Sequence, residues 1–242
     1  MARHTIPMLV PCALVLSLGC GGGGAEVEPP QDDGDSSGGE IAAGTTAPIV
    51  MRTTTPVPVP QPAVARENLS ADLQSLWDVI EAAVAIRPPE PPTAGTIEEV
   101  QQWSEGPFAE WMRSRMAAVH AAEEAAGFVD GAAPMERAVA AALFGYLYED
   151  TAASVRGAPV PDAIAADEEL LMVYADTLTD ALEPVAVQSV QAYAACATSL
   201  AQLGDPAWSE WIQYCADRGR EVATVFEVAA HVSEPAADSE QP

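Results

Sequence analysis

Residues 185–226 read VAVQSVQAYAACATSLAQLGDPAWSEWIQYCADRGREVATVF, and this stretch decides the fold of the chain. Gly204, Asp205 and Pro206 stand at its centre, where a glycine that ends one helix is followed by an N-cap aspartate and a first-turn proline. Apolar residues recur at helical spacing on both sides of this turn. They are Val190, Tyr193, Cys196, Ala197 and Leu200 before it, and Trp208, Trp211, Ile212, Cys215, Val222 and Phe226 after it. The stretch therefore predicts a helical hairpin.

The same helical period continues through the whole of residues 66–232, and no stretch convincingly suggests a strand. We expect further helices over about 71–86, 96–103, 107–127, 134–156 and 162–184, with Ser70, Thr96 and Asp162 as N-caps. Gly106-Pro107 is expected to break the chain of helices, and Pro184 to kink or restart one. The sequence thus predicts an all-α fold, a single domain of six to seven helices arranged as helical hairpins. The acidic residues 233–242 are expected to be disordered.

The charge of the chain excludes several classes of function. The 242 residues include 36 acidic and 10 basic side chains, all ten of them Arg, for a net charge of −26. A nucleic-acid binder needs a basic surface to neutralise phosphates, so no nucleic acid is expected as a partner. A P-loop and Schiff-base chemistry both need Lys, which the sequence lacks. Three His leave little for a zinc site.

No constellation of residues in the sequence supports catalysis. His120 lies one helical turn from Glu123, and Glu227 lies one turn from His231, but neither pair has further metal ligands nearby. The sequence contains neither a Gly-x-Ser-x-Gly nucleophile elbow nor a His-Glu-x-x-His zinc motif. We therefore expect a protein that is not an enzyme, with no catalytic residue, no metal and no cofactor.

The N-terminus has the pattern of a bacterial lipoprotein signal. The apolar run from Ile6 to Leu18 has 13 residues, which is shorter than the roughly 20 that span a bilayer. It ends in Leu16-Ser17-Leu18-Gly19-Cys20, so residues 1–19 are predicted to be removed and Cys20 to carry lipid. The alternative is an ordinary signal peptide with an incidental Cys. Gly21 stands where Asp would retain a Gram-negative lipoprotein at the inner membrane, so we expect an outer-membrane location in the cell envelope.

Residues 20–65 are expected to form a disordered tether that begins with the lipid-bearing Cys20. Residues 21–65 contain eight Gly and seven Pro, with six acidic residues and one Arg. Such a composition buries too little apolar surface to offset the cost of ordering the chain. The tether is followed by the helical domain over residues 66–232.

The cysteines fall into two groups. Cys12 lies in the signal sequence and Cys20 is the predicted lipid site, which leaves Cys196 and Cys215. The midpoint between these two falls at the Gly204-Asp205-Pro206 turn, so an antiparallel hairpin brings them to the same height. An envelope protein is exposed to oxidising conditions, and we predict a Cys196–Cys215 disulfide. The alternative is two free thiols packed in the core.

The stretch from about Thr96 to Arg218 resembles a known helical domain. The matching elements are Trp103…Gly106-Pro107…Trp111, Ala158-Pro159-Val160-Pro161, Leu171 with Tyr174, Leu178, Pro184, Tyr193-Ala194-Ala195-Cys196, and Gly204…Trp208-Ser209-Glu210-Trp211…Cys215. In this order they resemble the C-terminal domain of many myxobacterial envelope lipoproteins and periplasmic tetratricopeptide-repeat proteins. The 34-residue repeats that commonly precede that domain are not seen here. The resemblance implies an envelope location and protein contacts, and it implies no catalytic residue.

These observations favour a membrane-anchored envelope lipoprotein that acts as a non-catalytic helical protein-interaction or scaffold module. Its expected partners are a membrane, through the lipid on Cys20, and an envelope protein. The alternative is a periplasmic lipoprotein that binds a small ligand between its helices. The pocket of that alternative would be lined by Trp103, Trp111, Trp208 and Trp211. The sequence leaves the oligomeric state open.

Overall fold

The computed structural model describes residues 52–92 and 96–228. Within these two ranges the chain forms helices and no strand, which confirms the all-α prediction. The predicted signal sequence, Cys20 and most of the expected tether lie outside the described residues. The same is true of the predicted acidic tail. No helix of the described part of the chain is long and apolar enough to cross a membrane.

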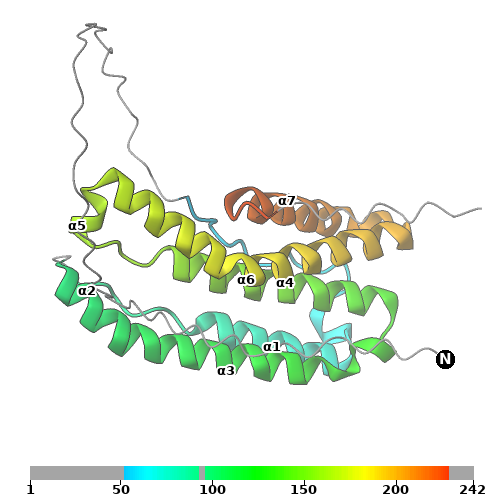
Figure 1. The fold of residues 1–242 in the computed structure, drawn as a ribbon. Helices are drawn as coiled ribbons and strands as arrows, with labels where there is room; N and C mark the ends of the chain where they lie inside the picture. Colours follow the sequence, from blue (N-terminus) through cyan, green and yellow to red (C-terminus); the bar gives the residue numbers. More distant parts are fainter. Residues whose placement is uncertain (1–51, 93–95, 229–242) are drawn as a thin grey trace, which may run out of the picture. The chain divides into compact units, whose positions relative to one another are not determined.

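The α-helices follow one another as labelled in Figure 1. They are α1 (Ala71–Ala85), α2 (Ile97–Trp103), α3 (Ala109–Ala125), α4 (Pro134–Arg156), α5 (Asp162–Ala165), α6 (Glu168–Leu203) and α7 (Ser209–Val225). Short helical turns precede or connect several of them: η1 (Arg66–Asn68), η2 (Ser104–Phe108), η3 (Ala126–Gly131) and η4 (Pro206–Trp208). Helix α5 is a single turn of four residues.

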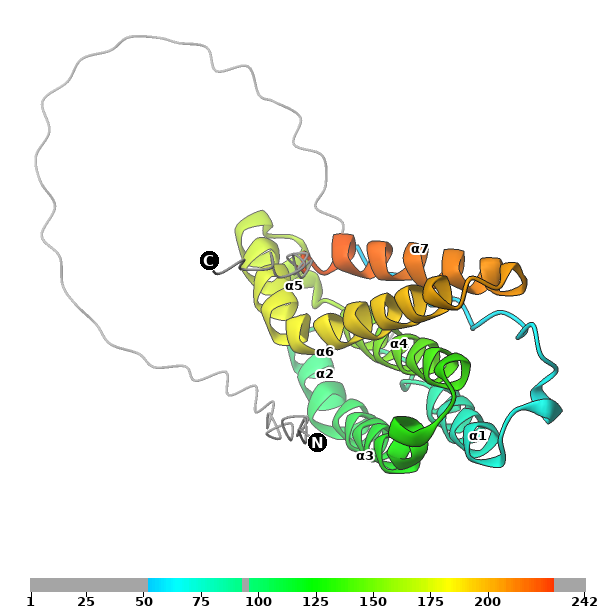
Figure 2. The same ribbon diagram turned by 90° about the vertical axis from the view of Figure 1, so that its right-hand side faces the viewer.

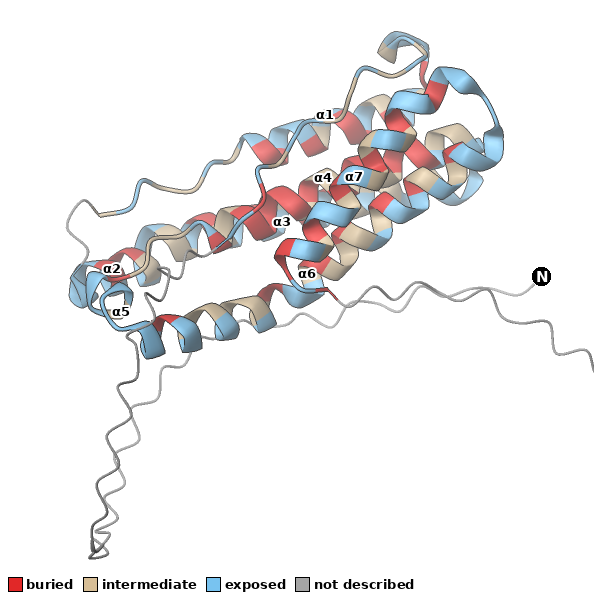
Figure 3. Ribbon diagram, turned by 90° about the horizontal axis from the view of Figure 1, so that it is seen from above, coloured by how far each residue is buried: buried red, intermediate tan, exposed pale blue. Residues whose placement is uncertain are grey.

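The helices pack in layers with α4 in the middle. Figures 1 and 2 show α1 and α3 on one side of α4, and α6 and α7 on the other. Because α4 has neighbours on both sides, buried residues surround most of its axis (Figure 3). The core is formed by large apolar side chains that are almost completely shielded from solvent. They include Leu73, Leu76, Ile80, Val139, Leu143, Leu147, Tyr193, Leu200, Trp211 and Val222.

Local signals at the helix ends act as the sequence predicts. The hydroxyl of Ser70 caps α1 by accepting a bond from the amide of Leu73. Thr96 and Glu99 form a reciprocal capping box at the start of α2. Gly204 ends α6 with a φ of +66°, a left-handed conformation that glycine adopts at low cost.

Two predicted helix boundaries are wrong. Residues Ser104–Phe108 form a π-helical turn that joins α2 to α3, so Gly106-Pro107 does not break the helical path. The wider turn relieves the clash that a proline ring causes in a regular α-helix. The helix expected to start at Asp162 is divided into α5 and α6, and Asp167 caps the longer helix by accepting bonds from two backbone amides.

Helix α6 continues through Pro184 without interruption over its 36 residues. It is bent between its two ends in Figures 1 and 2, as expected for a helix with an internal proline. The bend lets the C-terminal half of α6 pack between α4 and α7. The expected kink is therefore present, and the alternative of a restart is not.

The α6–α7 hairpin brings Cys196 and Cys215 together. The two form a disulfide with a Cα–Cα distance of 6.2 Å, and both side chains are buried. This geometry confirms the predicted pairing. The disulfide joins α6 to α7.

The expected boundary between tether and domain is wrong. Residues 52–65, which we call the strap, lie extended along the helical domain rather than free of it. Val59 and Val64 of the strap pack against the core, and Thr54 is buried. The composition of the strap is that of a linker, which is why the sequence predicts a tether there. Its contacts are with residues about 150 positions away, which a local reading of the chain does not reveal.

Candidate functional site

The strap is extended because of its prolines. Every second residue from 56 to 62 is Pro, which fixes φ near −65° and disfavours the helical region for the residue before it. Pro56, Val59 and Pro62 are partly buried, whereas Val57 and Gln61 are exposed. Pro60 and Val64 are partly buried too, so the strap contacts the domain along most of its length, and its regularly spaced prolines favour a polyproline II conformation.

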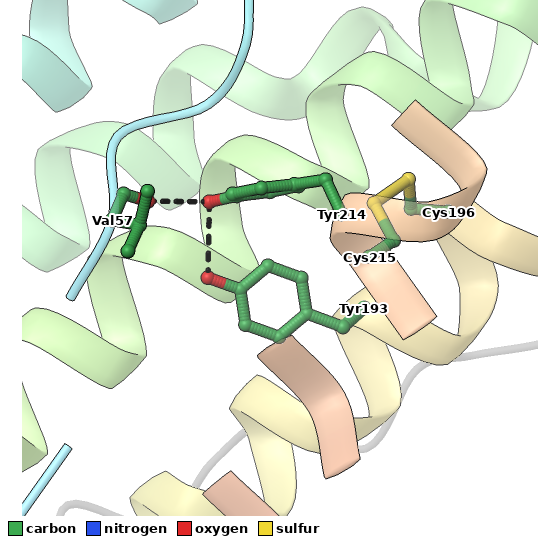
Figure 4. The surroundings of a disulfide bond; sticks show 5 residues. All are labelled: Val57, Tyr193, Cys196, Tyr214 and Cys215. Atoms are coloured by element: carbon green, nitrogen blue, oxygen red, sulfur yellow. Dashed lines mark hydrogen bonds between the residues drawn. A yellow bond between two sulfur atoms is a disulfide. The ribbon is translucent and has the colours of Figure 1, made fainter. Parts of the chain in front are cut away.

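Two side chains of α7 hold the strap through its backbone. The indole Nε1–H of Trp211 donates to the carbonyl oxygen of Gln61 at 2.9 Å. The Tyr214 hydroxyl donates to the carbonyl oxygen of Val57 at 2.7 Å (Figure 4). Trp211 and Tyr214 are one helical turn apart and therefore lie on one face of α7. Each accepting carbonyl immediately precedes a proline, Pro58 or Pro62.

The strap runs antiparallel to α7, so its N-terminal end reaches the C-terminal half of that helix. Arg52 lines a shallow depression there together with Asp217 and Glu221. Farther along, the Thr53 hydroxyl lies 3.4 Å from the carbonyl oxygen of Ala153 in α4. The strap is thus in contact with two helices of the domain.

A buried polar cluster lies beneath Tyr214. The Tyr193 hydroxyl of α6 donates to Glu149 of α4 at 2.8 Å and lies 3.4 Å from the Tyr214 hydroxyl. Arg218 of α7 forms a two-pronged ion pair with the same carboxylate. Figure 4 shows the path from Tyr193 through Tyr214 to Val57. Helices α4, α6 and α7 therefore meet at the Glu149 carboxylate, and Tyr214, which lies against this cluster, holds the strap.

Burial makes the two phenols of this cluster harder to ionise. It raises the pKa of Tyr193 far above the ordinary value near 10, and the neighbouring Tyr214 and Glu149 raise it further. Burial also raises the pKa of Tyr214. Burial works against the charge of Arg218, but its hydrogen bond and ion pair with Glu149 outweigh this effect and raise its pKa. At neutral pH both tyrosines are therefore donors, and Arg218 is charged.

A second proline-rich segment is held by the same kind of contact. Residues 86–92 read IRPPEPP and follow α1. Trp111 Nε1–H donates to the carbonyl oxygen of Ile86 at 2.9 Å, and Trp103 Nε1–H donates to that of Glu90 at 2.9 Å. Phe108 packs between the two indoles, with ring centroids 4.6 Å and 5.0 Å away. Indole donors thus bind carbonyls of both proline-rich segments.

A buried ion pair stands beside this second segment. Arg115 of α3 is completely buried, and its guanidinium contacts Asp150 of α4 at 2.9 Å and the carbonyl oxygen of Ile86 at 2.9 Å. Burial lowers the pKa of Arg115 and raises that of Asp150, while the attraction between them opposes both shifts. The pair links α3 and α4 across the middle of the domain.

The four tryptophans expected to line one ligand pocket do not meet. Trp103 and Trp111 form one aromatic group with Phe108, while Trp208 and Trp211 form another with Trp77. All four are buried, and three of them donate to the backbone of a proline-rich segment. The pocket prediction is therefore wrong, because these indoles are used to hold the chain itself.

The described residues contain no cluster of three or more His, Cys, Asp or Glu side chains that could hold a metal. His120 and Glu123 do meet, with Nδ1 3.1 Å from Oε2, but His120 is exposed on the surface of α3. His231, the partner expected for Glu227, lies outside the described part of the chain.

Comparison with known proteins finds no relative of this chain. The chain matches no family model, no curated protein and no solved structure. The residues that sequence reasoning missed are Glu149, Arg218, Arg115 and Asp150, because an isolated charge on a helix is usually solvent-exposed. The proline runs beside a tryptophan-rich domain are the signal that could have pointed to the two segments.

Proposed function

We propose that this chain is a lipid-anchored envelope protein whose helical domain binds a protein partner and performs no catalysis. The observation that carries this proposal is the attachment of the strap to α7 through Trp211 and Tyr214. In a lipoprotein anchored at Cys20, the strap is the part of the domain nearest to the lipid in sequence. Its bonds to α7 would transmit a pull from the membrane to the core of the domain.

The surface of α6 supports a role in protein binding. Leu170, Met172 and Val173 in its N-terminal half expose between 47% and 59% of their surface. Acidic residues, Glu168, Glu169 and Asp176 among them, lie beside these side chains on the same helix. Apolar side chains rimmed by charged ones are typical of surfaces that contact other proteins. The resemblance to myxobacterial envelope lipoproteins favours the same role.

A crosslinked pull-down from intact envelopes tests the proposal. We expect one protein to be recovered with the wild-type chain and with Cys12→Ala, which leaves the predicted lipid site intact. The same protein should be lost with Cys20→Ala, because the domain is then no longer held at the membrane. Palmitate labelling of the three chains reports acylation independently. Recovery of no partner with the acylated wild type would contradict the proposal, as would equal recovery with Cys20→Ala.

A further inference from the structure

We propose that the face of α7 bearing Trp211 and Tyr214 is a binding site for proline-rich extended peptides, and that a partner carrying such a segment binds there by displacing the strap. This inference rests on the proposed function and names the class of partner. The strap is then the occupant supplied by the chain itself. Its contacts show which chemistry the site recognises.

The donors at this site bind the backbone of a proline-rich segment. Both donors bind carbonyl oxygens that precede a proline, at Val57 and Gln61. Proline has no N–H and little conformational freedom, so such a segment offers unpaired carbonyls and loses little entropy when it binds. Aromatic grooves with hydroxyl or indole donors recognise polyproline II peptides in this way. The contacts with α7 therefore depend more on the backbone conformation of the bound segment than on its side chains.

The strap also defines the sequence that fits. Pro56, Val59, Pro60 and Pro62 are all partly buried, and Val59 packs against the core, so an aliphatic residue between two prolines occupies the centre. The two bound carbonyls are four residues apart. Arg52 precedes this pattern and lines a depression with Asp217, Glu221 and Arg220. The two carboxylates are already paired with Arg220 and Arg218, so charge does not specify the residue at the N-terminal end. The expected partner segment is therefore x-Pro-aliphatic-Pro-x-Pro.

The donors are held in place by contacts that do not involve the strap. Trp211 packs edge-on against Trp77 and Trp208, at centroid distances of 6.2 Å and 5.7 Å. Tyr214 lies against Tyr193, which is bonded to Glu149. Cys215 immediately follows Tyr214 in the chain, and its disulfide with Cys196 joins α7 to α6. The site is consequently pre-organised for a second occupant.

A competing peptide must replace both the hydrogen bonds of the strap and its apolar contacts, because Val59 and Val64 pack against the core and Thr54 is buried. Val57 is 46% exposed, and the two hydrogen bonds from α7 hold carbonyl groups that water can also solvate. A competing peptide can bind only while the strap is away from the site. Its apparent affinity is therefore its intrinsic affinity multiplied by the fraction of time that the site is free. Weakening the strap should therefore increase binding of a peptide in trans.

Peptide binding to the purified full chain tests this inference. The probe is a fluorescent peptide with the sequence of residues 52–65, and the control peptide has Ser at its four prolines. The chain carries Cys20→Ala so that no detergent is needed. We expect the variant Pro58→Ser/Pro62→Ser to bind the probe at least tenfold more tightly than the chain with an intact strap. Adding Tyr214→Phe to that variant should weaken binding about fivefold, whereas adding Gln213→Ala on the exposed side of α7 should not.

Failure of the strap variant to bind the probe, or equal binding of the control peptide, would overturn the inference. If the strap variant does not fold, the wild-type strap is tested directly. The chain is labelled with 5-fluorotryptophan, and a nitroxide-bearing peptide is added. Selective broadening of the Trp211 resonance, identified with Trp211→Phe, supports the site, and broadening of no resonance overturns it. These results are independent of the envelope pull-down, which tests the proposed function alone.

Discussion

The indole of Trp211 donates a 2.9 Å hydrogen bond to the carbonyl oxygen of Gln61, which lies 150 residues earlier in the chain. The bond joins the last helix of the domain to a segment whose composition is that of a linker. Trp103 and Trp111 bind the second proline-rich segment in the same manner. The domain thus uses its aromatic donors to order parts of the chain that contain few amide donors of their own.

The Tyr214 hydroxyl should contribute modestly to stability. Tyr214→Phe removes its bond to Val57, and we expect the free energy of unfolding to fall by about 0.5–1.5 kcal/mol because water replaces the lost donor at an accessible carbonyl. Urea denaturation followed by circular dichroism measures the change. Gln213→Ala is the control, because Gln213 is exposed and donates to Asp217 on its own helix. Equal effects of the two substitutions would contradict the role given to Tyr214.

Gly145 should not tolerate a side chain. A Cβ atom at this position would lie 2.7 Å from the ring of Tyr193, which is completely buried and bonded to Glu149. Gly145→Ala should therefore lower the free energy of unfolding by about 1–3 kcal/mol, although Ala favours helix over Gly. Gly127→Ala is the matched control, since a Cβ there meets no atom within 4 Å. A stabilised Gly145→Ala protein would show that the contact is not tight.

The Arg115–Asp150 pair should be more costly to break than to remove. Asp150→Ala leaves the fully buried guanidinium without its carboxylate, and we expect a loss of about 3–5 kcal/mol in the free energy of unfolding. The double variant Arg115→Met/Asp150→Leu should lose less, because it leaves no buried charge unpaired. Denaturation curves of the single and double variants test this order. The reverse order would show that the pair itself stabilises the fold.

The buried tyrosines should make the protein sensitive to alkali. Their pKa values are raised in the folded state, so the stability that neutral Tyr193 and Tyr214 contribute is fully present below pH 10 and is lost as the pH rises above 10. Each phenol should steepen the fall of the unfolding free energy by up to about 1.4 kcal/mol per pH unit. Urea denaturation between pH 9 and 11 should show a shallower fall for Tyr214→Phe than for wild type. Identical slopes, or phenolate absorbance appearing near pH 10 in the folded protein, would argue against burial of these hydroxyls.

The disulfide should be detectable by peptide mapping and should stabilise the domain. Cleavage after Glu210 separates Cys196 from Cys215, so the two resulting peptides should stay linked until a reductant is added. Reduction, or replacement of both residues by Ala, should lower the free energy of unfolding by roughly 3 kcal/mol for a loop of this length. Two separate peptides without reductant would show that the thiols are free.

The sequence by itself determined the features that depend on neighbours along the chain. Ser70 and Thr96 begin helices and Gly204 ends one, because caps act within a single turn. The apolar period predicted the helical core, and the positions of Cys196 and Cys215 around the Gly204 turn predicted their pairing. The steric effect of a proline is also local, but how it is accommodated is not. Gly106-Pro107 lies within a continuous helical path, and α6 continues through Pro184 instead of restarting.

Only the tertiary structure decided what the prolines and tryptophans do. The runs at residues 56–62 and 86–92 have the local composition of a linker and of a helix stop, and nothing nearby in the sequence indicates a partner. Trp211 reaches the first run and Trp111 reaches the second only after the helices have packed in layers around α4. The pairing of Glu149 with Arg218, and of Arg115 with Asp150, has the same origin. Such contacts depend on the distances between packed helices, and these are set by the shape of the whole core.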